Sequence, residues 1–267
     1  MEELSSVKEN IAAAYNFFEK YTASFLKQSE REVADVMALK KEHALKVSKL
    51  SGIVATNLML EEEDIVLAEI IGLLHDIGRF EQYVRYQTFD DKKSEDHAEL
   101  GVNILKEQAF FSGFPEEQQN IISRAILNHN KETISLKDDK LVVIYSQILR
   151  DADKLEIWES CVINLLRNGN FKFDAISLNL PVTGQVSDEI IRSIKSQKLA
   201  KKKDMQSVND FKLMVMSMVF DLNFRGSFQL LNEKQLIKKL YDSMPKKDVV
   251  IDAYRELRLY IENKFIV

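Results

Sequence analysis

The sequence predicts an all-α fold, on two grounds. Only three prolines and eight glycines occur in 267 residues, which leaves little of the turn chemistry that a many-stranded β-protein requires. Leucine, isoleucine, lysine and glutamate, which occur readily in helices, are abundant. We therefore expect a helical bundle with an additional block of helices at its C-terminal side.

Apolar residues at helical spacing predict the individual helices in chain order. They cover residues 5–28, 31–50, 61–76, 95–109, 116–129, 140–167, 188–202, 207–223, 232–243 and 248–263. Helix-start residues support two of these boundaries, because Ser94 and Asp96 precede His97, and Pro115 precedes Glu116. Asn168 and Gly169 are typical of a helix end.

Residues 170–187 interrupt this helical pattern. They contain Pro181 and Gly184 and lack helical periodicity, so they are compatible with a linker, a short β-hairpin or an ordered loop over a site. We therefore divide the chain into a helical domain over 1–169, a connecting loop over 170–187 and a C-terminal helical block over 188–267. The block is expected to pack on the first domain in one compact unit.

Composition limits the partners and the location. The net charge of −5, from 37 basic and 42 acidic residues, gives no electrostatic reason to expect a nucleic-acid partner, and small soluble ligands fit better. Cys161 is the single cysteine, and MEELSSVKEN lacks the features of a signal peptide, so a cytoplasmic location is expected. No apolar run reaches the roughly 18 residues of a membrane-spanning helix. A homo-oligomer is compatible with the sequence.

Polar residues interrupt the apolar stripes of several helices. His43 lies within the apolar stripe of Val36, Leu39, Val47 and Leu50, and Asp151 is the one charged residue in the stripe that runs from Ile144 to Val162. His97 and His129 each continue an apolar helix face. His75 and Asp76 end the apolar run from Ile65 to Leu74.

Each of these residues alone fits a hydrogen-bonded core position, because neutral imidazole is often buried. Together, four histidines and two aspartates on five predicted helices are explained by one buried site for divalent metal ions. Imidazole and carboxylate suit Fe, Mn, Co, Ni or Zn. Asp76 is the candidate for a bridging carboxylate, and Gly78 would loosen the helix end so that His75 and Asp76 converge.

The order of these residues resembles the signature of the HD-domain superfamily, an all-α fold of metal-dependent phosphohydrolases. His43, His75-Asp76 in LLHDIGR and Asp151 in RDADKLE match its H…HD…D pattern, and the resemblance covers about residues 30–167. With His97 and His129, the order is similar to that of members holding two metal ions. The resemblance implies that His43, His75, Asp76 and Asp151 hold the first ion, and that His97 and His129 hold the second, with Asp76 shared.

The resemblance implies a phosphohydrolase that cleaves a phosphate ester of a nucleotide or another small phosphorylated metabolite with a metal-activated hydroxide. One alternative is a mixed-valent di-iron oxygenase resembling myo-inositol oxygenase, since ligand order does not separate the two chemistries. A second alternative is a non-catalytic sensor of a metal or a nucleotide.

Two cations are candidates for contacts with the substrate phosphate. Arg79 and Lys154 each follow a candidate ligand by about one helical turn, so both could border one pocket. With Asp76 they complete the predicted catalytic residues. Asp96 is interpreted as a carboxylate at a helix start, and the polar segment from Tyr86 to Lys93 is given no role.

Overall fold

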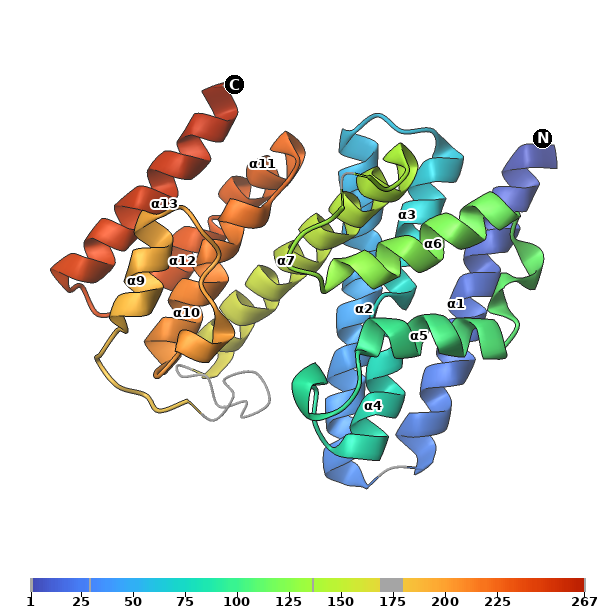
Figure 1. Ribbon diagram of the computed structural model, residues 1–267, viewed down its shortest axis with the longest axis horizontal. Coiled ribbons are helices and arrows are strands. Elements are labelled where there is room, and N and C mark those ends of the chain that lie inside the picture. The colour runs from blue at the N-terminus through green and yellow to red at the C-terminus, as the bar shows by residue number, and fades with distance from the viewer. Residues whose placement is uncertain (1, 29, 136, 169–179, 267) are drawn as a thin grey trace. The chain divides into compact units, whose positions relative to one another are not determined.

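The all-α prediction is confirmed by a computed structural model (Figure 1). The structure describes residues 2–28, 30–135, 137–168 and 180–266, and within these ranges it contains helices and no strand. None of the helices in these ranges combines the length and the apolar character needed to cross a membrane.

The chain divides into two units, Met1–Asp153 and Lys154–Val267. The division falls inside helix α7 (Lys140–Asn168), whereas the predicted boundary of the first domain was at residue 169. The physical reason is that the second half of α7 is bonded to helices of the second unit: Trp158 Nε1 donates to Val215 O at 2.8 Å, and Lys234 pairs with Glu159.

The first unit holds the residues of the predicted site. Its helices are α1 (Glu2–Gln28), α2 (Arg31–Asn57), α3 (Glu62–Leu74), α4 (Gly78–Tyr86), α5 (His97–Glu107), α6 (Glu116–His129) and the first part of α7, with short 3-10 helices η1 (Asp91–Lys93) and η2 (Phe110–Gly113). Helix α4 was not predicted, because it has only nine residues and so short an amphipathic segment gives a weak periodic signal.

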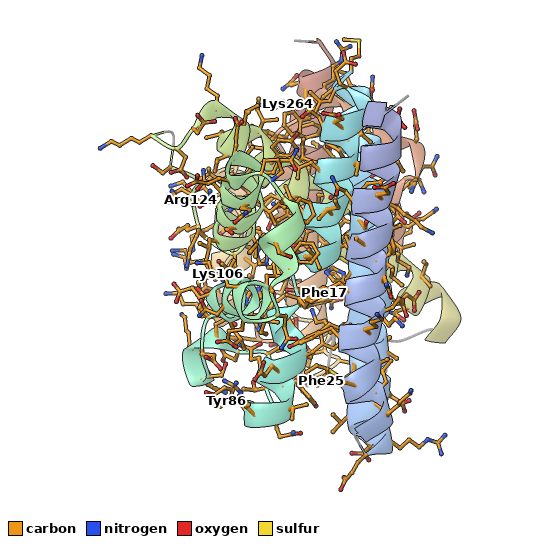
Figure 2. The ribbon with its side chains drawn as sticks, turned by 90° about the vertical axis from the view of Figure 1, so that its right-hand side faces the viewer. Phe17, Phe25, Tyr86, Lys106, Arg124 and Lys264 are labelled. Carbon is orange, nitrogen blue, oxygen red and sulfur yellow. The ribbon has the colours of Figure 1, made fainter. Side chains whose placement is uncertain are left out.

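The core of this unit forms where α2, α3 and α1 pack together. Buried side chains of α2 meet those of α3, among them Val47, Val54, Ile70 and Leu74. Aromatic rings join α1 to its neighbours, since the Phe25 ring lies 5.9 Å from that of Phe80, and the Phe17 ring lies 4.9 Å from that of Phe110. Figure 2 labels Phe17 and Phe25 on α1. This packing fixes α2 and the end of α3, which carry three of the candidate ligands.

The second unit is also helical. It contains the rest of α7, α9 (Asp188–Lys195), α10 (Val208–Ser217), α11 (Arg225–Glu233), α12 (Leu236–Asp242) and α13 (Asp248–Ile266), with 3-10 helices η3 (Lys202–Asp204) and η4 (Met218–Asp221). Of the predicted connecting loop, residues 170–179 lie outside the described residues. Residues 180–187 form an irregular segment bonded to the start of α10, where Asp210 accepts hydrogen bonds from the backbone N–H and the hydroxyl of Ser187.

Gly78 has a different role from the one predicted. Helix α3 already ends at Leu74, and His75 to Ile77 form a turn before α4 begins. A Cβ atom at Gly78 would overlap the backbone oxygen of His97 and lie 2.7 Å from the backbone nitrogen of Gly101. The glycine therefore lets α4 approach α5 closely.

We expect Gly78→Ala to lower the free energy of unfolding by about 3 kcal/mol or more, at the upper end of overpacking effects, because backbone atoms must move. Urea denaturation followed by circular dichroism measures this. Gly113→Ala is the control, since a Cβ atom there would meet no described atom within 4 Å. Equal midpoints for the two variants would contradict the close packing.

Candidate metal centre

The four histidines and Asp76 come together in the first unit from four separate places in the fold. His43 lies within α2, His75 and Asp76 in the turn after α3, His97 at the first residue of α5, and His129 at the last residue of α6. His75 and His97 are each 1% exposed and Asp76 is 4% exposed. The turn, the two helix ends and the interior of α2 thus direct all five side chains into one cluster.

The histidines form two pairs on either side of Asp76. Nε2 of His43 lies 3.3 Å from Nε2 of His75, and Nε2 of His97 lies 3.0 Å from Nε2 of His129. The Oδ2 atom of Asp76 faces the first pair, at 3.8 Å from His43 Nε2 and 3.7 Å from His75 Nε2. Its Oδ1 atom faces the second pair, at 3.3 Å from His97 Nε2 and 3.8 Å from His129 Nε2.

The outer ring nitrogens of three histidines are bonded to oxygen atoms. Nδ1 of His75 lies 2.8 Å from Gly72 O, Nδ1 of His129 lies 2.6 Å from Ile126 O, and Nδ1 of His97 lies 2.8 Å from Asp91 Oδ2. These oxygens only accept hydrogen bonds, so each Nδ1 carries the proton. In the neutral rings, Nε2 then presents a lone pair toward the cluster.

This arrangement fits a metal ion. The Nε2 lone pairs of His97 and His129 point at each other, which is unfavourable unless a cation lies between them. Burial lowers the pKa of His75 to about 4, and burial also lowers the pKa of His97, so these two rings favour the neutral form, which binds metal. By distance, His43, His75 and Asp76 form one group of potential ligands, and Asp76, His97 and His129 form another.

Asp153, which the sequence analysis did not select, reaches the first pair. Its Oδ1 atom lies 3.2 Å from His43 Nε2 and 3.9 Å from His75 Nε2, and its side chain is 22% exposed. Although burial alone would raise the pKa of Asp153, the hydrogen bond and charge of His43 hold it well below its usual value. Asp151 is fully buried; like Asp153, it is absent from the groups of potential ligands that lie close together among the described residues, and its role as a metal ligand stays a prediction.

Two cations flank Asp76. Lys40 Nζ lies 3.0 Å from Oδ2, and Arg79 Nε lies 3.4 Å from Oδ1. Burial by itself would raise the pKa of Asp76, but Lys40, His75 and Arg79 together hold it well below the usual value. Lys40 precedes His43 by about one helical turn, and Arg79 follows Asp76 by the same spacing. Lys40 was not predicted as a phosphate contact because the prediction used only cations that follow a candidate ligand.

The remaining predicted site residues have other surroundings. Lys154 belongs to the second unit, where its Nζ lies 2.8 Å from Asp221 Oδ2, and its role as a phosphate contact stays a prediction. The interpretation of Asp96 is confirmed, because its side chain accepts hydrogen bonds from the backbone N–H groups of Ala98 and Glu99 at the start of α5.

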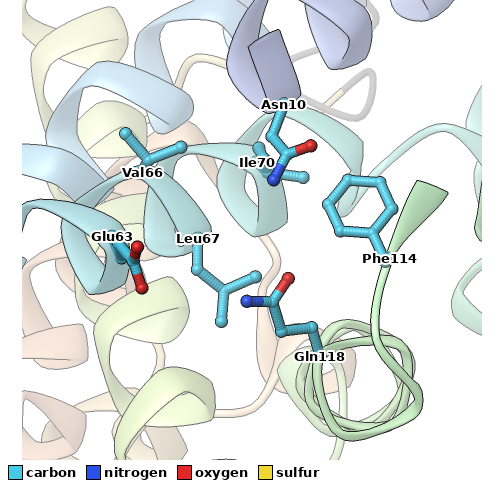
Figure 3. Close-up of a pocket in the computed structure, with 7 residues that line it drawn as sticks. All are labelled: Asn10, Glu63, Val66, Leu67, Ile70, Phe114 and Gln118. Atoms are coloured by element: carbon cyan, nitrogen blue, oxygen red, sulfur yellow. The ribbon is translucent and has the colours of Figure 1, made fainter. Parts of the chain in front are cut away.

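A shallow pocket in the same unit is separate from this cluster. It is lined by residues from α1, α3, α6 and the segment before α6, namely Asn10, Glu63, Val66, Leu67, Ile70, Phe114 and Gln118 (Figure 3). None of the candidate ligands lines it.

Comparisons with known proteins agree with the arrangement of the cluster. Residues 41–158 match the family model described as HD domain. Ribonuclease Y from Staphylococcus epidermidis is 28% identical over 171 residues, which cover 60% of this chain and 29% of that protein. Ribonuclease Y from Listeria welshimeri is 32% identical over 91 residues, which cover 34% of this chain and 14% of that protein.

The chain therefore spans less than a third of the length of these curated relatives. No solved structure gives a significant match. The matched segment contains His43, His75, Asp76, His97, His129 and Asp153. Residues 41–158 thus match an HD domain, and this segment of the chain is similar to proteins of the HD-domain superfamily.

Proposed function

We propose that this chain is a metal-dependent phosphohydrolase with a centre for two divalent transition-metal ions. The observation that carries the proposal is the position of Asp76, whose two carboxylate oxygens each face a different histidine pair. A carboxylate with one ion at each oxygen is the usual bridge of a dinuclear site. His43, His75, Asp76 and Asp153 would hold the first ion, and Asp76, His97 and His129 would hold the second.

Two ions held there would supply a water molecule of lowered pKa and would screen the charge of the phosphoryl group. The chain itself supplies orientation and charge. Bonds from Nδ1 keep three of the imidazole rings turned toward the cluster. Arg79 is held by Gln82, Asp91 and the backbone oxygen of Phe89, so its guanidinium is fixed beside the position that a phosphate would take.

Two substrate classes are supported by different observations. A small phosphate ester fits the net charge of −5, because a chain of this charge has no general attraction for a polyanion. RNA is the second candidate, because the relatives that match this chain are named Ribonuclease Y. Because of this name, RNA stands as a candidate substrate despite the expectation, from the net charge, against a nucleic-acid partner.

An assay with three substrates separates these classes. The purified chain, supplied with Mn²⁺, is incubated with p-nitrophenyl phosphate, with bis-p-nitrophenyl phosphate and with a labelled single-stranded RNA. We expect hydrolysis of at least one of them, lost on addition of a chelator and restored by the metal. Cleavage of the monoester alone would favour a small-molecule phosphatase, and cleavage of both RNA and the diester would favour a nuclease.

No hydrolysis with Mn²⁺, Co²⁺, Ni²⁺, Zn²⁺ or Fe²⁺ would contradict the proposed function. If the purified chain then contained two iron ions per molecule, the oxygenase alternative would take its place. Bound metal with neither activity would favour the sensor.

A further inference from the structure

The histidines of the two pairs are oriented in different ways. His75 and His129 each bond through Nδ1 to the carbonyl oxygen three residues earlier, Gly72 O and Ile126 O. His75 directly follows the last residue of α3, and His129 is the last residue of α6, so the preceding helical turn supplies the acceptor. A backbone acceptor of this kind is present whatever the neighbouring side chains are.

His97 is the first residue of α5, so no helical turn precedes it. Its Nδ1 bonds instead to a side chain, Oδ2 of Asp91, at 2.8 Å. Asp91 lies in η1, in the polar segment between α4 and α5 for which no role was predicted. Of the three histidine orientations fixed by a bond that the structure describes, this one alone depends on a side chain.

The other oxygen of Asp91 is bonded to α4. Oδ1 accepts hydrogen bonds from Arg79 Nη1 at 2.9 Å and from Gln82 Nε2 at 2.8 Å. Gln82 is fully buried and also donates to Ser94 and to the backbone oxygen of Glu95, so the segment is fastened to α4 at several points. One carboxylate therefore holds both His97 and Arg79.

We propose that Asp91 is a positioning residue that sets the metal affinity of the His97–His129 half of the centre and aligns Arg79 with it. The inference rests on the proposed function, because it concerns the second of the two ions. Partners of this kind fix the tautomer and direction of a histidine ligand, and their loss typically lowers metal affinity by about 10- to 100-fold. The His43–His75 half has no bond to Asp91 among the described interactions and keeps its affinity.

The test is a titration with Mn²⁺ of the metal-free chain, followed by calorimetry and by electron paramagnetic resonance. The wild type should bind two equivalents and give the spectrum of a spin-coupled pair. In Asp91→Asn, the amide group can present its oxygen either to His97 or to Arg79 and Gln82, but it cannot accept from both sides. We expect the second equivalent to bind about 10- to 100-fold more weakly, with the six-line spectrum of an isolated Mn²⁺ ion at one equivalent.

Asp90→Asn is the matched control, since Asp90 is the adjacent carboxylate and its described side-chain interactions, a hydrogen bond from Lys92 N and an ion pair with Lys93, lie within residues 90–93 and away from the histidines. Asp91→Ala repeats the test without an amide, and His97→Ala supplies the one-ion reference spectrum. Circular dichroism verifies that each variant is folded.

The outcomes separate the two proposals. A wild type that binds no Mn²⁺ would overturn the metal centre itself. A wild type that binds two ions, with Asp91→Asn and Asp91→Ala binding both ions at unchanged affinity, would overturn the role of Asp91 and leave the centre standing. Equal weakening of both ions would also overturn it, because a general loss of structure would have that effect.

Discussion

Replacing Asp76 by asparagine should remove at least one of the two metal ions and lower the rate of hydrolysis by about 10³-fold, which corresponds to roughly 4 kcal/mol of transition-state stabilisation. The reason is geometric. The two oxygens of Asp76 face different histidine pairs, and an asparagine could offer an oxygen to only one of them. Its NH₂ group would face the other pair, where a ligand atom is needed.

The measurement is metal content by elemental analysis together with the rate on the best of the three substrates. Asp242→Asn is the control, because Asp242 is an exposed aspartate of the second unit that pairs with Lys238. An Asp76→Asn variant that kept two equivalents of metal and the rate of the wild type would contradict the bridging role.

Replacing Asp153 by asparagine should weaken binding of the ion held by His43 and His75 and reduce hydrolysis by at least about 10²-fold. Asp153 Oδ1 lies 3.2 Å from His43 Nε2, so its loss removes a carboxylate from the first ion only. The second ion, beside His97 and His129, should still bind.

Asp151→Asn is the matched comparison, two residues earlier on the same helix, and it should retain both metal ions. Mn²⁺ titration of the two variants separates the assignments. Loss of the first ion in Asp151→Asn, with both ions kept in Asp153→Asn, would contradict the assignment from the structure and restore the one from the sequence.

The choice between Asp151 and Asp153 depends on information that apolar periodicity does not contain. Residues two apart on a helix point roughly 200° apart, so Asp151 and Asp153 face nearly opposite directions. The apolar stripe of α7 selected Asp151, because periodicity identifies the side that is packed in the core. Asp153 instead faces His43 and His75, on a side of α7 that the apolar stripe does not mark.

The helices were predicted well where they are long and periodic. Helix α6 begins and ends at the predicted residues, and α7 begins at Lys140 as predicted. Two helices of nine residues, α4 and α11, were not predicted, because their periodic signal is short. Tertiary packing stabilises such segments, as the close approach of α4 to α5 at Gly78 indicates.

The candidate site was predicted in part. All four histidines and Asp76 lie in the cluster. They were predicted because each is a polar residue in an otherwise apolar sequence pattern. Lys40 and Asp91 gave no such contrast, since the first lies among other charged residues of α2 and the second in a polar segment. Their proximity to Asp76 and His97 depends on how the helices pack.

We expect two metal ions on either side of Asp76. A crystal of the chain grown with Mn²⁺, measured at a wavelength that gives anomalous scattering from manganese, would locate them. Two anomalous peaks bridged by Asp76 are expected, one bound by His43, His75 and Asp153 and the other by His97 and His129. A crystal with no peak at this cluster, or with one peak that Asp76 does not contact, would contradict this expectation.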